Sequence, residues 1–204
     1  MSGPLVRTAV STVIVLSLGI GALWAGTDGF LAVTAEQARR LAVARAPRPL
    51  PPVTLEDQNG RSFRLADYHG KKLLVDFIYT RCRTICGVLS ADFQRLAGLT
   101  RAENSSGAEL LSISFDPDAD TPAALKAYAG RYVVDGKVWR FARIEDRAAF
   151  GEMLRAFEVV AIRDPFGDFQ HNAAIYLVDE NGRLVHIFGY DELEQAAEAA
   201  MTRR

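Results

Sequence analysis

The two cysteines of the chain, Cys82 and Cys86, follow a nearly continuous apolar run at residues 72–79, KLLVDFIY. A run of this length and composition is typical of a β-strand buried on both faces. Helical periodicity follows from about Gly87 to Leu99. Any fold of this chain must therefore place both cysteines where a buried strand gives way to a helix.

Short strands and helices alternate through the rest of the chain. A turn and a short strand are predicted before the apolar run, in GRSFRLADYHGKK. After it we expect strands at 109–115 and 138–144, helices at 121–132, 145–159 and 191–204, and a hairpin at 172–189 with Asn181 and Gly182 in its turn. This order predicts an α/β fold, a thioredoxin-like central mixed sheet with helices on both faces.

The N-terminal segment has a different composition. No residue from Thr8 to Gly26 is charged, and a helix over this run would span roughly 28 Å, close to the thickness of a bilayer core. We expect residues 1–27 to form a membrane anchor, with Arg7 before it and Trp24 near its far end. A cleaved signal peptide is the alternative. In either case the rest of the chain is expected to be exported into a compartment where thiols tend to oxidise.

Two further segments follow the anchor. Residues 28–46 are predicted to be a juxtamembrane connector, in which Thr34 and Gln37 make a capping box for a short helix ending near Arg45. Residues 47–204 are predicted to form the folded domain, entered through the stiff segment PRPLPPV. The formal net charge of −1 leaves no broad basic surface for nucleic acid.

The spacing of the cysteines suits joint chemistry. Positions i and i+4 lie on one face of a helix, so both sulfurs can point at the same spot. The helix N-terminus, with Arg81 and Arg83 nearby, is expected to lower both thiol pKa values and favour thiolate. Two convergent thiolates serve reversible disulfide chemistry or hold a soft metal. A disulfide with a purely structural role is the alternative, although a bridge that closes so small a loop constrains the unfolded chain little.

His171 is the candidate third ligand. It stands in the predicted loop DPFGDFQHN, just before a buried strand. In a thioredoxin-like topology this strand lies beside the one that carries the cysteines. Two thiolates and one imidazole suit Cu(I) and can hold Cu(II), whereas structural zinc wants a fourth ligand. Sulfurs that flank a metal stand further apart than the roughly 2.05 Å of a disulfide, which explains the wider spacing.

Several polar residues have simpler interpretations. A loop histidine that only forms hydrogen bonds is the alternative for His171, and His69 and His186 are expected to be structural. The alternating aspartates of FDPDADTP, Asp116, Asp118 and Asp120, lack the glycine and glutamate of a calcium-binding loop. Turn and helix-cap roles explain them better, with Thr121 as N-cap and Pro122 in the first helical position.

At these motifs the chain resembles the Sco/SenC family, which are membrane-anchored thioredoxin-like copper proteins involved in assembling cytochrome c oxidase. The shared features are YTRCRTIC after an apolar strand, SFDPDADTP after the third strand, and HNAAIYLVDENGRL. They extend over about residues 48–190. The resemblance implies that Cys82, Cys86 and His171 fall on the copper-ligand positions.

The neighbours of these three residues depart from the family pattern. Family members commonly have proline after each cysteine, where this chain has Arg83 and Gly87. Gln170 and Asn172 flank the histidine, where an aspartate and a serine or threonine are usual. Such changes can shift metal affinity, redox potential or the choice of partner.

Three functional hypotheses follow. The first is a copper chaperone, a binding protein without a small-molecule substrate, which holds one copper ion through Cys82, Cys86 and His171. It would deliver copper to the dinuclear copper site of a cytochrome c oxidase subunit, or to another copper client. It would be a single-pass protein of the inner membrane with its soluble domain in the periplasm, or an equivalent exported space. The second is a membrane-tethered thiol:disulfide reductase that uses Cys82 and Cys86 as its redox dithiol, and the third is a redox or copper sensor.

Overall fold

The computed structural model describes residues 3–82, 85–102, 108–132, 138–165 and 167–202. Its contacts divide the chain into two compact units, Met1–Arg45 and Ala46–Arg204. In the first unit, helix α1 (Pro4–Gly26) is the one helix of the described residues that is long and apolar enough to cross a membrane. Helix α2 (Ala35–Arg45) begins with the predicted capping box, because Thr34 and Gln37 exchange two 3.1 Å hydrogen bonds.

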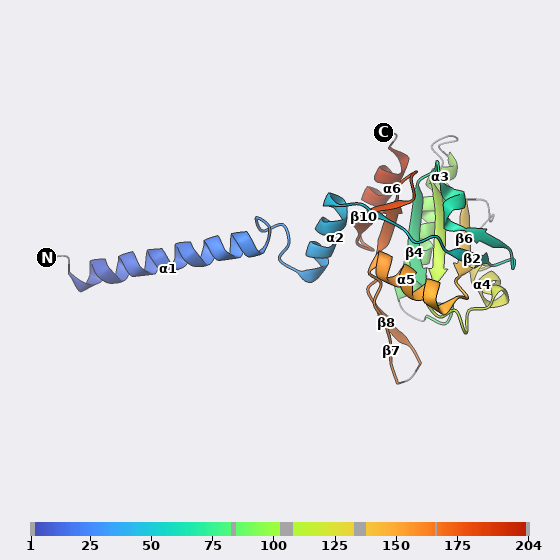
Figure 1. The fold of residues 1–204 in the computed structure, drawn as a ribbon, viewed down its shortest axis with the longest axis horizontal. Coiled ribbons are helices and arrows are strands. Elements are labelled where there is room, and N and C mark those ends of the chain that lie inside the picture. Colours follow the sequence, from blue (N-terminus) through green and yellow to red (C-terminus); the bar gives the residue numbers. More distant parts are fainter. Residues whose placement is uncertain (1–2, 83–84, 103–107, 133–137, 166, 203–204) are drawn as a thin grey trace. The chain divides into compact units, whose positions relative to one another are not determined.

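The second unit is built on a mixed sheet, as predicted (Figure 1). Its centre is three parallel strands, β4, β5 and β6, and the strands on either side run antiparallel to their neighbours. The full order is β1 (Arg48–Pro49), β10 (Arg183–Phe188), β9 (Ile175–Val178), β4 (Leu73–Ile78), β5 (Glu109–Ser114), β6 (Trp139–Arg143), β2 (Thr54–Asp57) and β3 (Ser62–Arg64). A short 3-10 helix, η1 (Leu65–Tyr68), follows β3.

The predicted turn between β9 and β10 is present. Gly182 has a φ of +73°, a conformation that costs glycine little. A Cβ atom at Gly182 would lie 2.7 Å from His69 Nε2, so the turn also needs glycine for packing against this ring. His69 therefore has a structural contact, as expected.

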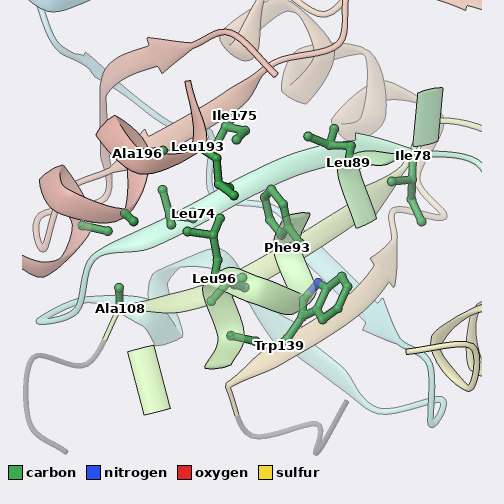
Figure 2. Close-up of a cluster of buried hydrophobic side chains, with 14 of the residues drawn as sticks. Leu74, Ile78, Leu89, Phe93, Leu96, Ala108, Trp139, Ile175, Leu193 and Ala196 are labelled. Carbon is green, nitrogen blue, oxygen red and sulfur yellow. The ribbon is translucent and has the colours of Figure 1, made fainter. Parts of the chain in front are cut away.

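Helices cover both faces of the sheet. Helices α3 (Ile85–Ala102), α4 (Pro122–Ala129) and α6 (Leu193–Met201) contribute to one apolar cluster, in which Phe93 and Trp139 are among the largest buried side chains (Figure 2). Thr121 caps α4 by accepting a hydrogen bond from the Ala124 amide. On the opposite face, Phe157 of helix α5 (Arg147–Phe157) packs edge-to-face on Phe77 and Tyr176.

Two sequence predictions near the cysteines need correction. Helix α3 begins at Ile85, two residues before the predicted start, so Cys86 lies in its first turn. The segment around His171, predicted as a loop, contains a second small sheet of β7 (Ala161–Arg163) and β8 (Phe169–His171). This hairpin projects from the edge of the domain (Figure 1). Its strands have only three residues each, too few for a period-two pattern to be recognised.

A carboxyl group is buried in the central strand. Asp76 of β4 has no exposed surface, and neither of its carboxylate oxygens has a hydrogen-bond partner among the described residues. The side chain of Ser112, its neighbour in register on β5, favours the charged form. Burial outweighs this effect and raises the pKa of Asp76 from 3.8 to about 7.

We expect Asp76 to make the fold less stable as the pH rises from about 4 to about 7. In this range the unfolded chain has lost the Asp76 proton while the folded chain still holds it, so rising pH favours unfolding. Asp76→Asn should remove this dependence of stability on pH. Above pH 7 its free energy of unfolding should exceed that of the parent by roughly 2–4 kcal/mol. Urea unfolding between pH 4 and pH 8 measures the difference.

The matched control is Asp118→Asn, because the Asp118 side chain is 69% exposed. This variant should keep the slope of the parent chain. A stability difference between Asp76→Asn and the parent that does not change with pH would contradict the assigned protonation of Asp76.

Candidate metal centre

Cys82 and Cys86 lie together at the entrance to α3. Neither forms a disulfide, and Cys82 is partly exposed whereas Cys86 is buried. The Cys82 amide donates to the Tyr79 carbonyl at 3.1 Å, which turns the chain out of β4. The Cys86 amide donates to the Cys82 sulfur at 3.4 Å. Cys82 therefore acts on an otherwise unpaired amide of the first helical turn, as a helix cap does.

The β7–β8 hairpin brings His171 to the same place. Its Nε2 atom lies 3.8 Å from the Cys86 sulfur. A sulfur and an imidazole nitrogen bound to one metal, at about 2.3 Å and 2.0–2.1 Å, would stand roughly 3.7 Å apart in a tetrahedral or trigonal site. The observed distance fits a shared metal ion with little movement of either side chain.

Aromatic rings hold the imidazole in position. The His171 ring lies 4.8 Å from the Phe115 ring and 6.5 Å from the Tyr79 ring, and Phe169 packs on both of these. Its Nδ1 atom is buried without a hydrogen-bond partner in the described part of the chain. With Nε2 turned toward Cys86, the ring presents the nitrogen that a metal would use.

The third predicted ligand, Cys82, is less closely placed. Within the described residues, no group of three histidine, cysteine, aspartate or glutamate side chains stands ready to enclose a metal ion. Cys86 and His171 are in position, whereas Cys82 approaches Cys86 through its contact with the backbone amide. A closed set of Cys82, Cys86 and His171 stays a prediction.

The expected low pKa of the thiols is wrong for Cys86. The neighbouring Cys82 sulfur, and after it burial, raises the pKa of the Cys86 thiol. Arg81 points elsewhere, because its guanidinium donates to Asp116 at 2.5 Å. Arg83, the other expected cation, lies outside the described residues. Cys86 is therefore a protonated thiol at neutral pH until its sulfur binds a metal ion or is oxidised.

The aspartate-rich segment after β5 holds the loop that leads to Cys82. Asp120 is fully buried and accepts hydrogen bonds from the Thr80 amide at 3.0 Å and the Thr80 hydroxyl at 2.6 Å. The Ser114 hydroxyl also donates to it, at 2.6 Å. The sequence predicted turn and cap roles for this segment but missed its contact with the cysteine loop, which joins residues 40 positions apart.

A second tether joins this segment to the hairpin. Asp116 is 3% exposed and accepts from Arg81 at 2.5 Å and from Arg163 of β7 at 2.8 Å. Arg163 also lies over the Phe169 ring of β8, with its guanidinium carbon 4.7 Å from the ring centroid. Asp116 thus links the residue before Cys82 to the hairpin that carries His171.

Asn172, where the chain departs from the family pattern, closes the base of the hairpin. Its side-chain oxygen accepts from the Val160 amide at 2.7 Å, and its side-chain nitrogen donates to the Glu158 carbonyl at 2.9 Å. Its own amide donates to the Val160 carbonyl at 3.3 Å. The side chain next to His171 therefore fixes where the strand carrying that ligand leaves the domain.

We expect Asn172→Ala to lower the affinity for Cu(I) roughly 10-fold to 100-fold, as loss of a group that positions a metal ligand does. Both hydrogen bonds of the side chain disappear, while Cys82, Cys86 and His171 remain. Competition against a Cu(I) chelator measures the change. An affinity equal to that of the parent would mean that the aromatic packing alone holds His171.

The comparisons with known sequences agree with these features. A family model described as SCO1/SenC matches residues 44–204. The SCO1 protein homolog of Bacillus subtilis (strain 168) is 29% identical over 160 residues, which cover 74% of this chain and 82% of the relative. The mitochondrial SCO2 homolog of Bos taurus is 26% identical over 189 residues, which cover 88% of this chain and 68% of the relative.

Solved structures confirm the predicted thioredoxin-like architecture. BsSco, in which a disulfide switch was identified, is a member of the Sco family of cytochrome c oxidase assembly proteins; it matches with a TM-score of 0.65 and 28% identity, over 78% of this chain and 96% of its own. The copper-bound ScoI of Bradyrhizobium japonicum matches with a TM-score of 0.61 and 26% identity, over 74% of this chain and 99% of its own. The matched residues include the strand-to-helix cysteines, the tethering aspartates and the histidine hairpin, and the chain belongs to the SCO1/SenC family.

Proposed function

We propose that this protein is a copper chaperone that binds one copper ion through Cys82, Cys86 and His171. The observation that carries the proposal is the 3.8 Å approach of His171 Nε2 to the Cys86 sulfur. Two thiolates and an imidazole form a soft set of few ligands, which suits Cu(I) and accommodates Cu(II). The relatives support the metal, since a ScoI structure with copper bound matches this chain.

The proposed client is the dinuclear copper site of a cytochrome c oxidase subunit. The support is family membership, because BsSco belongs to the cytochrome c oxidase assembly proteins. Cys82 is the partly exposed member of the pair, and Cys86 is buried. An incoming client thiolate would reach copper on the Cys82 side and replace the ligands one at a time.

The N-terminal unit is proposed to hold the protein in the inner membrane by a single span. The charge-free run within α1 is long enough for a bilayer core. Residues 28–46 would connect this anchor to a copper domain of residues 47–204 in the periplasm or an equivalent exported space.

Titration of the reduced full chain, in detergent, with Cu(I) and then Cu(II) tests the proposal. Native mass spectrometry should find one copper ion per chain, and a chain oxidised to the disulfide should bind none. A stoichiometry other than one, or equal binding by the oxidised chain, would count against a site made from these ligands.

A second function rests on the thiols themselves. Cys82 and Cys86 are both reduced and lie in contact at the start of α3, and the related BsSco has a disulfide switch. The same dithiol could reduce the copper-binding cysteines of the client before delivery. Copper-free reduced protein should then reduce a disulfide in a client peptide, and a Cys82→Ser chain should not. Failure of this reaction removes the reductase role and leaves copper binding untouched.

A further inference from the structure

We propose that the loop between α1 and α2, residues 27–33, is a second membrane contact. It inserts the side chains of Phe30, Leu31 and Val33 into lipid at the boundary between headgroups and acyl chains. This inference rests on the proposed membrane span of α1. It goes beyond that span because it assigns lipid contact to residues after the helix, in the segment predicted to be a connector.

The loop presents its apolar side chains outward. Phe30 is 51% exposed, Leu31 is 62% exposed and Val33 is 59% exposed. Large apolar side chains gathered in one exposed segment are unfavourable in water and mark a surface that contacts something else. Because α1 ends at Gly26, directly before this loop, the occupant nearest to it is the lipid that surrounds the end of the span.

The loop satisfies its backbone polar groups internally. The Phe30 amide donates to the Thr27 hydroxyl at 3.1 Å, and the Ala32 amide donates to the Thr27 carbonyl at 2.9 Å. The Val33 amide donates to the Gln37 side chain at 3.1 Å. A segment that enters lipid needs such bonds, because acyl chains offer no partner to a backbone group. A linker in water does not need them.

The loop also folds back on the last turn of α1. The Gly29 amide donates to the Trp24 carbonyl at 2.8 Å, and a Cβ atom at Gly29 would lie 3.5 Å from Trp24 Nε1. Phe30 and Leu31, which follow Gly29, therefore lie near the level of Trp24. Tryptophan rings favour the membrane boundary, so the same boundary is where Phe30 and Leu31 would meet lipid.

The backbone of the loop is costly without such a contact. Asp28, Gly29 and Phe30 have φ values of 55°, 75° and 67°, all in the left-handed region. Glycine adopts this region freely and aspartate tolerates it, but a bulky aromatic residue is disfavoured there. Such a conformation persists where its surroundings favour it. Half of Phe30 is exposed, and insertion of its ring into lipid would supply the favourable contact.

The charges near the loop suit a surface with anionic headgroups. Residues 27–45 hold three arginines and two acidic residues, which leave one net positive charge. Both acidic side chains are ion-paired with arginines: Asp28 with Arg45, and Glu36 with Arg39 and Arg40. The loop can therefore approach anionic lipid without an uncompensated negative charge.

Tryptophan quenching by brominated lipids tests the proposal on the full chain, in nanodiscs that hold one chain each. The chain has two tryptophans, Trp24 and the buried Trp139. Trp24→Phe therefore leaves Trp139 as a constant background. Adding Phe30→Trp or Leu31→Trp to Trp24→Phe reports on the loop, and the parent chain reports on the end of α1.

Phosphatidylcholine brominated close to the headgroup should lower the emission of both loop tryptophans about two-fold or more, because they lie at the headgroup boundary. Lipid brominated near the end of the acyl chain should quench them less, and iodide in the buffer should have little effect. Trp24 in the parent chain should respond like the loop tryptophans. Trp24→Phe alone is the control, and neither lipid should quench it.

Loop tryptophans that iodide quenches and brominated lipid does not would overturn the proposal, because the loop would then lie in water. Loop tryptophans that neither quencher reaches would also overturn it, because protein would then cover the loop. In both cases quenching of Trp24 by lipid would leave the membrane span of α1 intact. Absence of lipid quenching at Trp24 as well would overturn the span together with the proposal that rests on it.

Discussion

A chain carrying His171→Ala is expected to bind Cu(I) roughly 10³-fold more weakly than the parent, a loss beyond that of a group that only positions a ligand. The imidazole nitrogen 3.8 Å from the Cys86 sulfur is the one ligand of the predicted set that comes from outside the cysteine loop. Without it, two thiols remain, which can still form a disulfide. Competition of the reduced chain against a Cu(I) chelator measures the affinity, and reaction with a small disulfide measures the dithiol.

The matched control is His186→Ala. His186 stacks on Phe188 with the ring centroids 4.2 Å apart, on strand β10. Its loss should leave the Cu(I) affinity within about two-fold, because no predicted ligand changes. If His171→Ala binds copper as tightly as the parent, the assignment of a three-ligand site is wrong.

Asp120→Ala is expected to have the largest effect on stability, about 3–5 kcal/mol, as removal of one partner from a buried charged network does. Asp120 is fully buried, and the substitution removes the acceptor of the Thr80 amide, the Thr80 hydroxyl and the Ser114 hydroxyl. Urea unfolding of the copper-free chain measures the loss. The Cu(I) affinity should fall as well, because Thr80 stands two residues before Cys82.

Asp118→Ala is the control in the same segment. Asp118 is exposed and pairs with Arg147 at 2.7 Å, a surface ion pair of the kind worth up to about 1 kcal/mol. Its removal should change stability by less than about 1 kcal/mol and leave copper binding unaltered. A loss in Asp120→Ala no larger than in Asp118→Ala would contradict the role given to Asp120 in holding the cysteine loop.

The main architecture could be predicted because local patterns and tertiary structure agree. The apolar run around Val75 is a fully buried strand, Thr121 caps its helix, and Gly182 makes its turn. The position of the cysteines at a strand-to-helix junction followed from the same patterns. His171 could be placed near them because the thioredoxin-like topology sets β9, the strand that follows it, beside β4.

The remaining features depend on contacts between distant segments, which sequence patterns do not contain. Asp120 looked like part of a turn, and only folding brings it to Thr80. The raised pKa of Cys86 comes from the Cys82 sulfur and from burial, which only the folded chain brings about. Asp76 was hidden inside an apolar run, where a single polar residue does not disturb a strand prediction.

X-ray absorption at the copper edge of the Cu(I)-loaded full chain tests the central claim most directly. We predict a copper ion with two sulfur neighbours and one imidazole nitrogen in the parent chain, and loss of that nitrogen in His171→Ala. A spectrum of sulfur neighbours alone in the parent chain, or one that His171→Ala leaves unchanged, would contradict the account.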